Sequence, residues 1–152
     1  MLSLSRIVKK LMGKVNNSSI TPLDDGMWSF VGHIQVLDEA LVSLYRYDEN
    51  DYYMAIRLYE EDVDESWLFV MTSPTFVIAY IEDLFGLHTI LLDMPCYYYV
   101  NDGELTFDKL KQIDNEEAFK LFNKYAAVKH RFSKEMAYKT VSLKQHLKKQ
   151  IK

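Results

Sequence analysis

Hydrophobic and polar positions alternate through three consecutive segments in the first half of the chain, Ala40–Tyr47, Tyr52–Glu60 and Ser66–Thr72. The segments are rich in Val, Ile, Tyr, Phe and Trp and contain neither Gly nor Pro, a composition typical of β-strands. Two acidic connections, 48–51 and 61–65, join them. Because short connections favour antiparallel neighbours, the pattern predicts a three-stranded meander.

A period of two sorts the side chains of this meander onto two faces. One face is aliphatic and is the predicted core side: Val42, Leu44, Met54, Ile56, Leu58, Leu68 and Val70. The other is mostly aromatic: Tyr45, Tyr47, Tyr53, Arg57, Tyr59, Trp67 and Phe69. A solvated face would alternate apolar with charged residues, so three interpretations of the aromatic face stay open. Helices cover it, a lid or a second copy of the chain covers it, or it binds another protein, because Tyr, Trp and Arg dominate binding hot spots.

Further strands are predicted on both sides of the meander. Met27–Val36 alternates in the same way, and Tyr97–Val100 forms a hairpin with Leu105–Phe107 across an Asn-Asp-Gly turn signal. Leu87–Asp93 is ambiguous between a strand and a helix, since periodicity does not separate them in so short an apolar run. The pattern therefore predicts a mostly antiparallel sheet of about five or six strands.

Helical spacing marks the chain between and around these strands. The clearest helix is 73–85, with Ser73 as its N-cap, Pro74 at the first helical position and Gly86 as its C-terminal stop. A basic amphipathic helix is expected at Met1–Val15. It is predicted to pack its apolar stripe on the sheet.

Two more helices are predicted in the C-terminal third. One spans 115–127 and begins at Asp114, which has capping-box spacing to Glu117. The other spans 133–151 and has a ragged apolar stripe. The whole chain is thus expected to be a single α+β domain, 1–152. In that domain the 27–107 sheet is covered by the 73–85 helix, the N-terminal helix and the basic helical region 114–152.

Composition is consistent with this expectation. The chain has 152 residues, of which 49% are hydrophobic and 14% aromatic, values typical of a globular protein. The single cysteine, Cys96, excludes an internal disulfide and is typical of a reducing, cytoplasmic location. No apolar run reaches the roughly 18 residues of a membrane span, so none is expected.

The net charge of −4 conceals a strong division along the chain. Residues 1–16 hold four basic and no acidic residues, and residues 124–152 hold nine basic residues against one acid. The middle, 17–123, holds 5 basic and 21 acidic residues. Such asymmetry bears on partners rather than on fold.

The sequence contains few signals of catalytic or metal-binding chemistry. Glycine-rich phosphate loops, paired cysteines and zinc-binding His spacings are missing from the sequence, and the four histidines fall in different segments. The acidic 61–65 turn lacks the glycine of a calcium loop. We therefore expect no metal, no cofactor and no enzymatic activity.

The first functional hypothesis is a non-enzymatic protein-binding module. Its candidate contact surface combines the aromatic face with the acidic turns: Tyr45, Tyr47, Tyr53, Arg57, Tyr59, Trp67, Phe69, Asp48, Glu49, Asp51, Glu61, Asp62, Asp64 and Glu65. Small size and dense acidic turns fit an inhibitor or immunity-type protein of a phage or other mobile element. Such a protein occupies a basic groove on its partner. A homodimer is a further expectation.

The alternative is a nucleic-acid-binding protein that uses its basic C-terminal region. Its candidate residues are Lys129, Arg131, Lys134, Lys144, Lys148 and Lys149, which are cations of the kind that contact phosphates. The acidic middle of the chain opposes this hypothesis, and a simpler explanation is that the basic ends neutralise that middle through surface ion pairs. A small hydrolase without a recognisable motif is the remaining alternative.

Overall fold

The computed structural model describes residues 28–63, 65–93, 96–101 and 110–151. The predicted helix 1–15 and the predicted strand 105–107 lie outside these residues.

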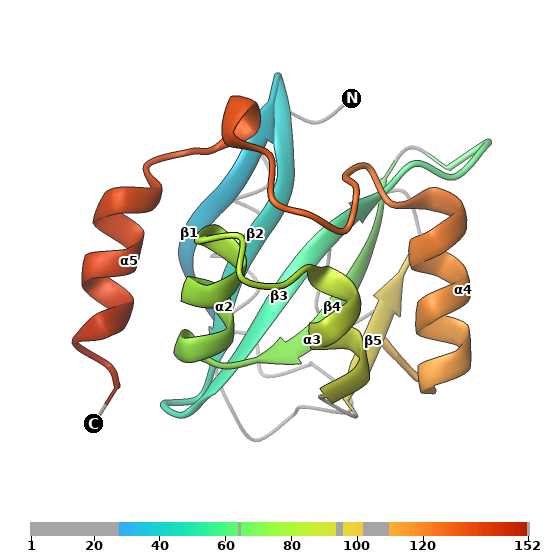
Figure 1. The fold of residues 1–152 in the computed structure, drawn as a ribbon. Helices are drawn as coiled ribbons and strands as arrows, with labels where there is room; N and C mark the ends of the chain where they lie inside the picture. Colours follow the sequence, from blue (N-terminus) through green and yellow to red (C-terminus); the bar gives the residue numbers. More distant parts are fainter. Residues whose placement is uncertain (1–27, 64, 94–95, 102–109, 152) are drawn as a thin grey trace.

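The fold is α+β, as predicted, and is built on one six-stranded antiparallel sheet (Figure 1). The strands pair in chain order: β1 (Trp28–Leu37), β2 (Glu39–Tyr47), β3 (Asp51–Leu58), β4 (Ser66–Thr72), β5 (Tyr97–Val100) and β6 (Lys111–Ile113). The meander is confirmed, and the bounds of β4 are those the sequence predicts. β1 and β6 form the two edges of the sheet.

Strand register explains how the two faces of the sheet arise. β2, β3 and β4 pair without interruption, so Tyr45 lies opposite Tyr53, and Arg57 lies opposite Trp67. β1 is different, because its pairing with β2 shifts at three places, between Phe30 and Gly32, between His33 and Gln35 and directly after Gln35. Such irregularities bend and twist a strand locally.

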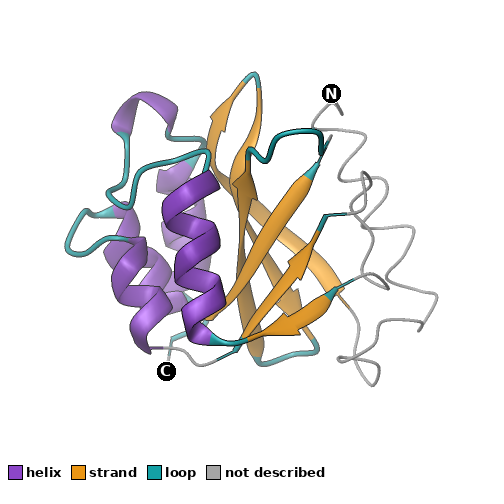
Figure 2. Ribbon diagram, turned by 90° about the vertical axis from the view of Figure 1, so that its right-hand side faces the viewer, coloured by secondary structure: helices purple, strands orange, loops and turns teal. Residues whose placement is uncertain are grey.

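The α-helices that the structure describes lie together on one side of the sheet (Figure 2). They are α2 (Pro74–Ile81), α3 (Leu87–Asp93), α4 (Asn115–Tyr125) and α5 (Thr140–Lys148), with a short 3-10 helix, η2 (Lys134–Met136). The ambiguous 87–93 segment is thus a helix. The helices cover the aliphatic face, where all seven predicted core residues of the meander are buried.

Both predicted N-caps are confirmed. The Ser73 hydroxyl accepts a hydrogen bond from the Phe76 backbone N–H at 3.2 Å, and the Asp114 carboxylate accepts one from Glu117 N–H at 2.9 Å. Each cap satisfies a backbone donor that the first helical turn leaves unpaired.

The predicted end of the first helix is wrong. α2 ends at Ile81 rather than Phe85, and the chain turns at Asp83, whose φ of 59° is left-handed. Gly86 does not stop this helix. A Cβ built there would lie 2.6 Å from the backbone oxygen of His130, so the glycine permits a close approach of two segments.

The predicted C-terminal helix 133–151 is also wrong in part, because it is broken into η2 and α5. Between them Ala137 pairs with Gln35 of β1, and the Tyr138 N–H donates to the Ile34 carbonyl at 3.1 Å. The segment therefore leaves the helical path to bond the outer edge of β1.

Candidate functional site: a groove along the edge of β1

The predicted aromatic contact surface is not open. Six of its seven residues are 7% exposed or less, and Tyr59, at 53%, is the exception. The rings pack on one another, with Trp28 lying 5.2 to 5.6 Å from Tyr47, Tyr53 and Phe69 between ring centroids. The structure thus corrects the expectation of a docking face there. The seven buried rings of this side and the half-buried ring of Phe30 belong to a second hydrophobic cluster, and the α-helices described above lie on the opposite side of the sheet.

Arg57 is held inside this cluster by polar and aromatic contacts. Its Nε donates to the Ala40 carbonyl at 2.8 Å and lies 3.5 Å from a Glu39 carboxylate oxygen. Its guanidinium carbon lies 4.4 Å from the ring centroid of Trp67, whose indole N–H donates to Glu65 at 2.8 Å. A buried charge needs such partners, so Arg57 has a structural role here.

Cys96 lies between two tyrosines of the same cluster. Its Sγ is 3.6 Å from the Tyr53 hydroxyl oxygen and 3.4 Å from that of Tyr98. Burial is the main cause that raises the pKa of both phenols well above the ordinary value, so both hydroxyls stay protonated.

The acidic turns do not form one surface. Asp48, Glu49 and Asp51 are exposed at the β2–β3 turn, and Glu61 and Asp62 are exposed at the β3–β4 turn. Consecutive turns of a meander lie at opposite ends of the shared strand, and eight-residue β3 separates these two by roughly 26 Å. The second turn also contains the predicted contact residues Asp64 and Glu65.

Glu65, predicted to be part of that acidic surface, is 3% exposed. It accepts the Trp67 indole hydrogen bond described above, so it belongs to the interior rather than to a contact surface. Asp64 lies outside the described residues.

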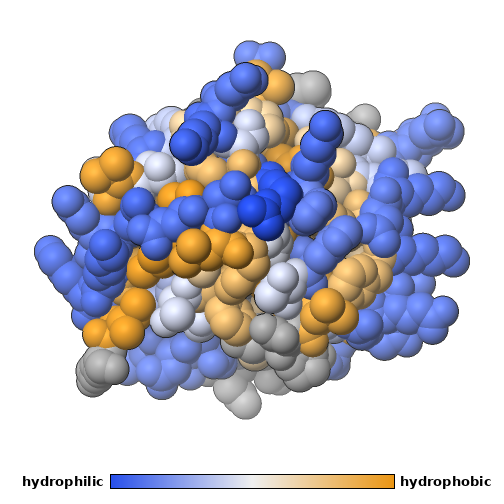
Figure 3. All heavy atoms as spheres, viewed as in Figure 1, coloured by the Kyte–Doolittle hydropathy of each residue, from blue (hydrophilic) through white to orange (hydrophobic). Residues whose placement is uncertain are grey.

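The basic candidates lie on the outside of the C-terminal region, and two of them are ion-paired. Arg131 Nε lies 2.9 Å from a carboxylate oxygen of Asp83, and Lys144 Nζ lies 3.6 Å from one of Glu82. Both acids follow α2, so these pairs join the C-terminal region to the acidic middle of the chain. The other four are exposed: Lys129, Lys134, Lys148 and Lys149. Hydrophilic side chains gather on the outer side of α4, and over α5 they are mixed with hydrophobic ones (Figure 3).

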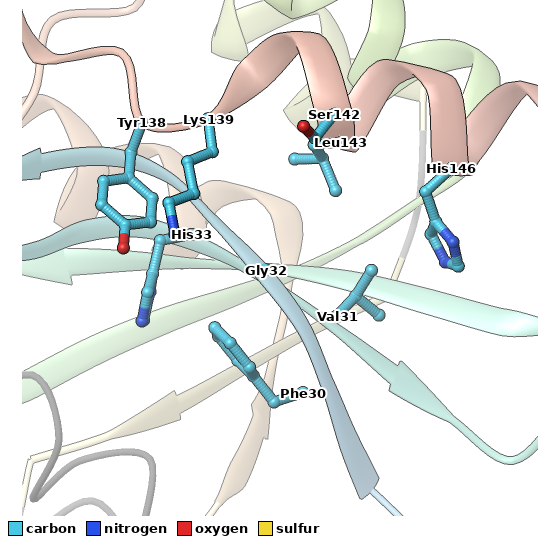
Figure 4. A pocket seen from close by; sticks show the side chains of 9 residues that line it. All are labelled: Phe30, Val31, Gly32, His33, Tyr138, Lys139, Ser142, Leu143 and His146. Carbon is cyan, nitrogen blue, oxygen red and sulfur yellow. The ribbon is translucent and has the colours of Figure 1, made fainter.

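A cavity of about 390 Å³ lies between β1 and α5. Its lining comes from two stretches that are far apart in sequence but adjacent in space (Figure 4): Phe30, Val31, Gly32 and His33, and then Tyr138, Lys139, Ser142, Leu143 and His146. We call this cavity the β1 groove. The sequence pattern does not reveal this groove, because the groove depends on the break in the C-terminal helix.

The position of the groove follows from strand geometry. Successive side chains of a strand point to opposite faces of the sheet, so a cavity that touches four consecutive residues, Phe30 to His33, runs along the strand's edge. β1 is an edge strand, and its outer side presents backbone N–H and C=O groups. Gly32 adds no side chain to this edge, and a Cβ built there would lie 3.4 Å from Leu143 Cδ1.

His33 forms the polar floor of the β1 groove. It is 7% exposed, and its Nδ1 lies 2.7 Å from the Ser43 hydroxyl oxygen. Its ring lies 4.4 Å from that of Phe30 and 6.0 Å from that of Tyr138, between centroids. Burial lowers the pKa of His33 to about 4, so the imidazole is neutral at pH 7.

The rim of the β1 groove is the start of α5. Lys139 precedes the helix with a left-handed φ of 48° and gives it no side-chain cap. Its ammonium lies 5.3 Å from the ring centroid of Tyr138, and in Figure 4 the side chain extends from α5 toward β1. The first N–H groups of a helix lack intrahelical partners and carry partial positive charge.

A second cavity of about 520 Å³ is lined by residues 127–133 and Met136. Because a single connecting segment supplies nearly all of its walls, its shape depends on that segment. The β1 groove is instead bounded by a strand and a helix. We therefore take the β1 groove as the candidate site.

Within the part of the chain that the structure describes, no group of three or more His, Cys, Asp or Glu side chains is arranged to hold a metal ion. Among the same residues, no helix is long and apolar enough to cross a membrane.

The fold and site define an α+β protein in which a six-stranded antiparallel meander carries one layer of helices and a groove along one edge strand. Comparison of the chain with protein-family models, curated proteins and solved structures finds no match.

Proposed function

We propose that this protein is a non-enzymatic protein-binding module that holds an extended segment of another protein along the outer edge of β1. The observation that carries the proposal is the β1 groove itself, a cavity against four consecutive residues of an edge strand. Extended peptides bind such edges by adding a strand. Main-chain hydrogen bonds then supply affinity, and side-chain pockets supply specificity.

The chain's own C-terminal segment supports this mode of binding. Ala137 and Tyr138 already pair with Gln35 and Ile34 on the outer side of β1, immediately beyond the groove. A bound segment at Phe30–His33 continues the same pairing in the other direction along the edge. The irregular register of β1 limits that pairing to a short stretch.

The burial of Ser43, the hydrogen-bond partner of His33, argues against a hydrolase built on this Ser–His pair. The Ser43 side chain is 0% exposed and lies beneath His33, so a substrate in the groove does not reach its hydroxyl. A nucleophile must meet the reacting atom directly. The pair instead fixes the orientation of the imidazole.

An inhibitor or immunity-type role is the finer form of the proposal, because a binder of this kind blocks the segment it holds. The exposed acids of the two turns, Asp48, Glu49 and Asp51 in the first and Glu61 and Asp62 in the second, remain candidate secondary contacts. Since they lie at opposite ends of the sheet, each is a separate surface rather than part of one.

The test begins with peptides selected from a random displayed library on the full-length protein. NMR chemical-shift changes on titration should map to the amides of Phe30–His33. Ser142→Trp fills the groove from an exposed position on α5 and should weaken binding at least about tenfold. Gln145→Trp is the matched control, since Gln145 is exposed on the same helix but does not line the groove, and it should bind within about twofold of the wild type.

Two results would overturn the proposal. One is a library that yields no peptide. The other is a selected peptide whose shifts map away from β1 and whose affinity the Ser142→Trp change leaves intact. Circular dichroism of both tryptophan variants separates loss of binding from loss of fold.

A further inference from the structure

We infer that the β1 groove recognises an acidic extended segment, in which acidic residues alternate with apolar ones. This inference rests on the proposed function and specifies the chemistry of the partner. It runs opposite to the expectation from sequence, in which acidic turns of this chain enter a basic groove on the partner.

The charge of the groove is the first argument. Its nine lining residues include no Asp or Glu, whereas Lys139 stands at its rim and His146 lies about two turns further along α5. The start of α5, which has no side-chain cap from Lys139, adds the partial positive charge of its first N–H groups. A carboxylate placed beside Lys139 meets both sources of positive potential.

The surroundings of the groove strengthen that potential. The nearby acids Glu82 and Asp83 are already paired with Lys144 and Arg131. Within the described part of the chain Lys139 forms no such ion pair, and its ammonium lies over the Tyr138 ring. Its charge is therefore available to an incoming anion.

The apolar lining supplies the second half of the recognition. Phe30, Val31 and Leu143 offer carbon surface, and the Leu143 side chain points toward β1 in Figure 4. Successive side chains of an extended segment point in opposite directions. A residue that faces this carbon surface is thus flanked by residues that face the rim, which gives the alternating pattern.

Charge also selects between possible occupants. Residues 1–16 of this chain carry four basic and no acidic residues, so they do not complement the rim. A second copy that pairs edge to edge through β1 brings two Lys139 rims toward one another. A separate acidic protein segment satisfies the rim without either conflict.

The experiment uses short fluorescent peptides in which Val alternates with Glu, with Gln or with Lys, titrated onto the full-length protein. We expect the Glu peptide to bind most tightly, with an affinity that falls as NaCl rises. Lys139→Gln should weaken the Glu peptide about three- to fivefold and leave the Gln peptide unchanged. Lys139→Glu should reverse the preference in favour of the Lys peptide. Lys149→Gln, at an exposed position outside the groove, is the control.

The possible outcomes separate this inference from the function on which it rests. If the three peptides bind the wild type with equal affinity and Ser142→Trp weakens all three, the groove binds extended segments but the acidic preference is wrong. If none binds although peptides selected from the random library do, the acidic preference is wrong and the proposed function stands; if the library also yields no binder, both proposals are wrong. If a single-stranded oligonucleotide displaces the Glu peptide with higher affinity, the polyanion is nucleic acid and the inference fails. If the protein dimerises through β1 in light scattering, with loss of dimer in Ser142→Trp, the occupant is a second copy and the inference fails.

Discussion

His33 shows how a single residue links the fold to the site. It sits on the edge strand with one ring nitrogen bonded to Ser43, and two aromatic rings flank it. The cation Lys139 lines the same cavity, and its positive charge disfavours a protonated imidazole at His33. The sequence shows His33 within an alternating segment, but neither its burial nor its neighbours, because Tyr138 reaches it from more than 100 residues away in the chain.

Because burial lowers the pKa of His33 from 6.5 to about 4, the residue should make stability pH-dependent. Between these values the unfolded chain binds a proton that the folded protein does not. The unfolding free energy therefore rises with pH across this window. The contribution of His33 to it is lost as pH falls from 6.5 toward 4. The full contribution is about 3 kcal/mol.

Urea denaturation at pH 7 and pH 4.5 should show it. The wild type is expected to lose about 2 to 3 kcal/mol more than His33→Gln over that interval, since all other titrating groups are common to both proteins. Parallel pH profiles for the two proteins would show that burial does not perturb the histidine.

Among the elements, local signals were predicted from sequence and long-range ones were not. The strands of the meander and the caps at Ser73 and Asp114 depend on neighbouring residues, so the pattern predicted them. The break between η2 and α5 depends on bonds from the 137–138 segment to β1, which no local pattern reveals. The β1 groove was missed for that reason. The same holds for the covering of the aromatic face, since a period of two separates two faces but does not say which of them is enclosed.

Gly86 lies where the start of α3 contacts the chain at His130. α3 begins where the Leu87 N–H donates to the His130 carbonyl at 2.7 Å, and the His130 ring stacks on His88 with centroids 4.7 Å apart. A Cβ at Gly86 would lie 2.5 Å from His130 Nδ1 and 2.6 Å from its backbone oxygen. Gly86→Ala should therefore lower the unfolding free energy by about 1 to 3 kcal/mol in urea titrations.

Gly32→Ala is the matched control for this substitution. The contact its Cβ would meet, at 3.4 Å, is to the end of the Leu143 side chain, which can adjust. We expect a change of about 0.5 kcal/mol or less. Equal effects of the two alanines would contradict the close approach at Gly86.

At the scale of the whole molecule, the divided charge is only partly balanced by contact. The ion pairs of Arg131 with Asp83 and of Lys144 with Glu82 join the basic C-terminal region to the acidic middle. They lie at the surface, with three of the four side chains 40% exposed or more, so water and salt screen them. Packing on the two faces of the sheet carries the stability instead, through Leu143 and Leu147 in the case of α5.

The double variant Arg131→Gln/Lys144→Gln should accordingly stay within about 1 kcal/mol of the wild type in unfolding free energy. Raising NaCl from low to moderate concentration should change the wild type by a similarly small amount. Thermal and urea unfolding at two salt concentrations measure both effects. A drop of several kcal/mol in either experiment would mean that charge neutralisation holds the C-terminal region in place.

The three register shifts in β1 have a consequence for how the protein behaves in concentrated solution. A flat and regular edge strand could pair with a strand from another molecule. The free edge of that added strand could then pair with a third, and repeated addition would form a fibre. An uneven border breaks the ladder after a few bonds and tilts whatever lies on it away from the plane of the sheet. β1 can therefore pair with one extended segment over a short stretch without promoting further strand addition.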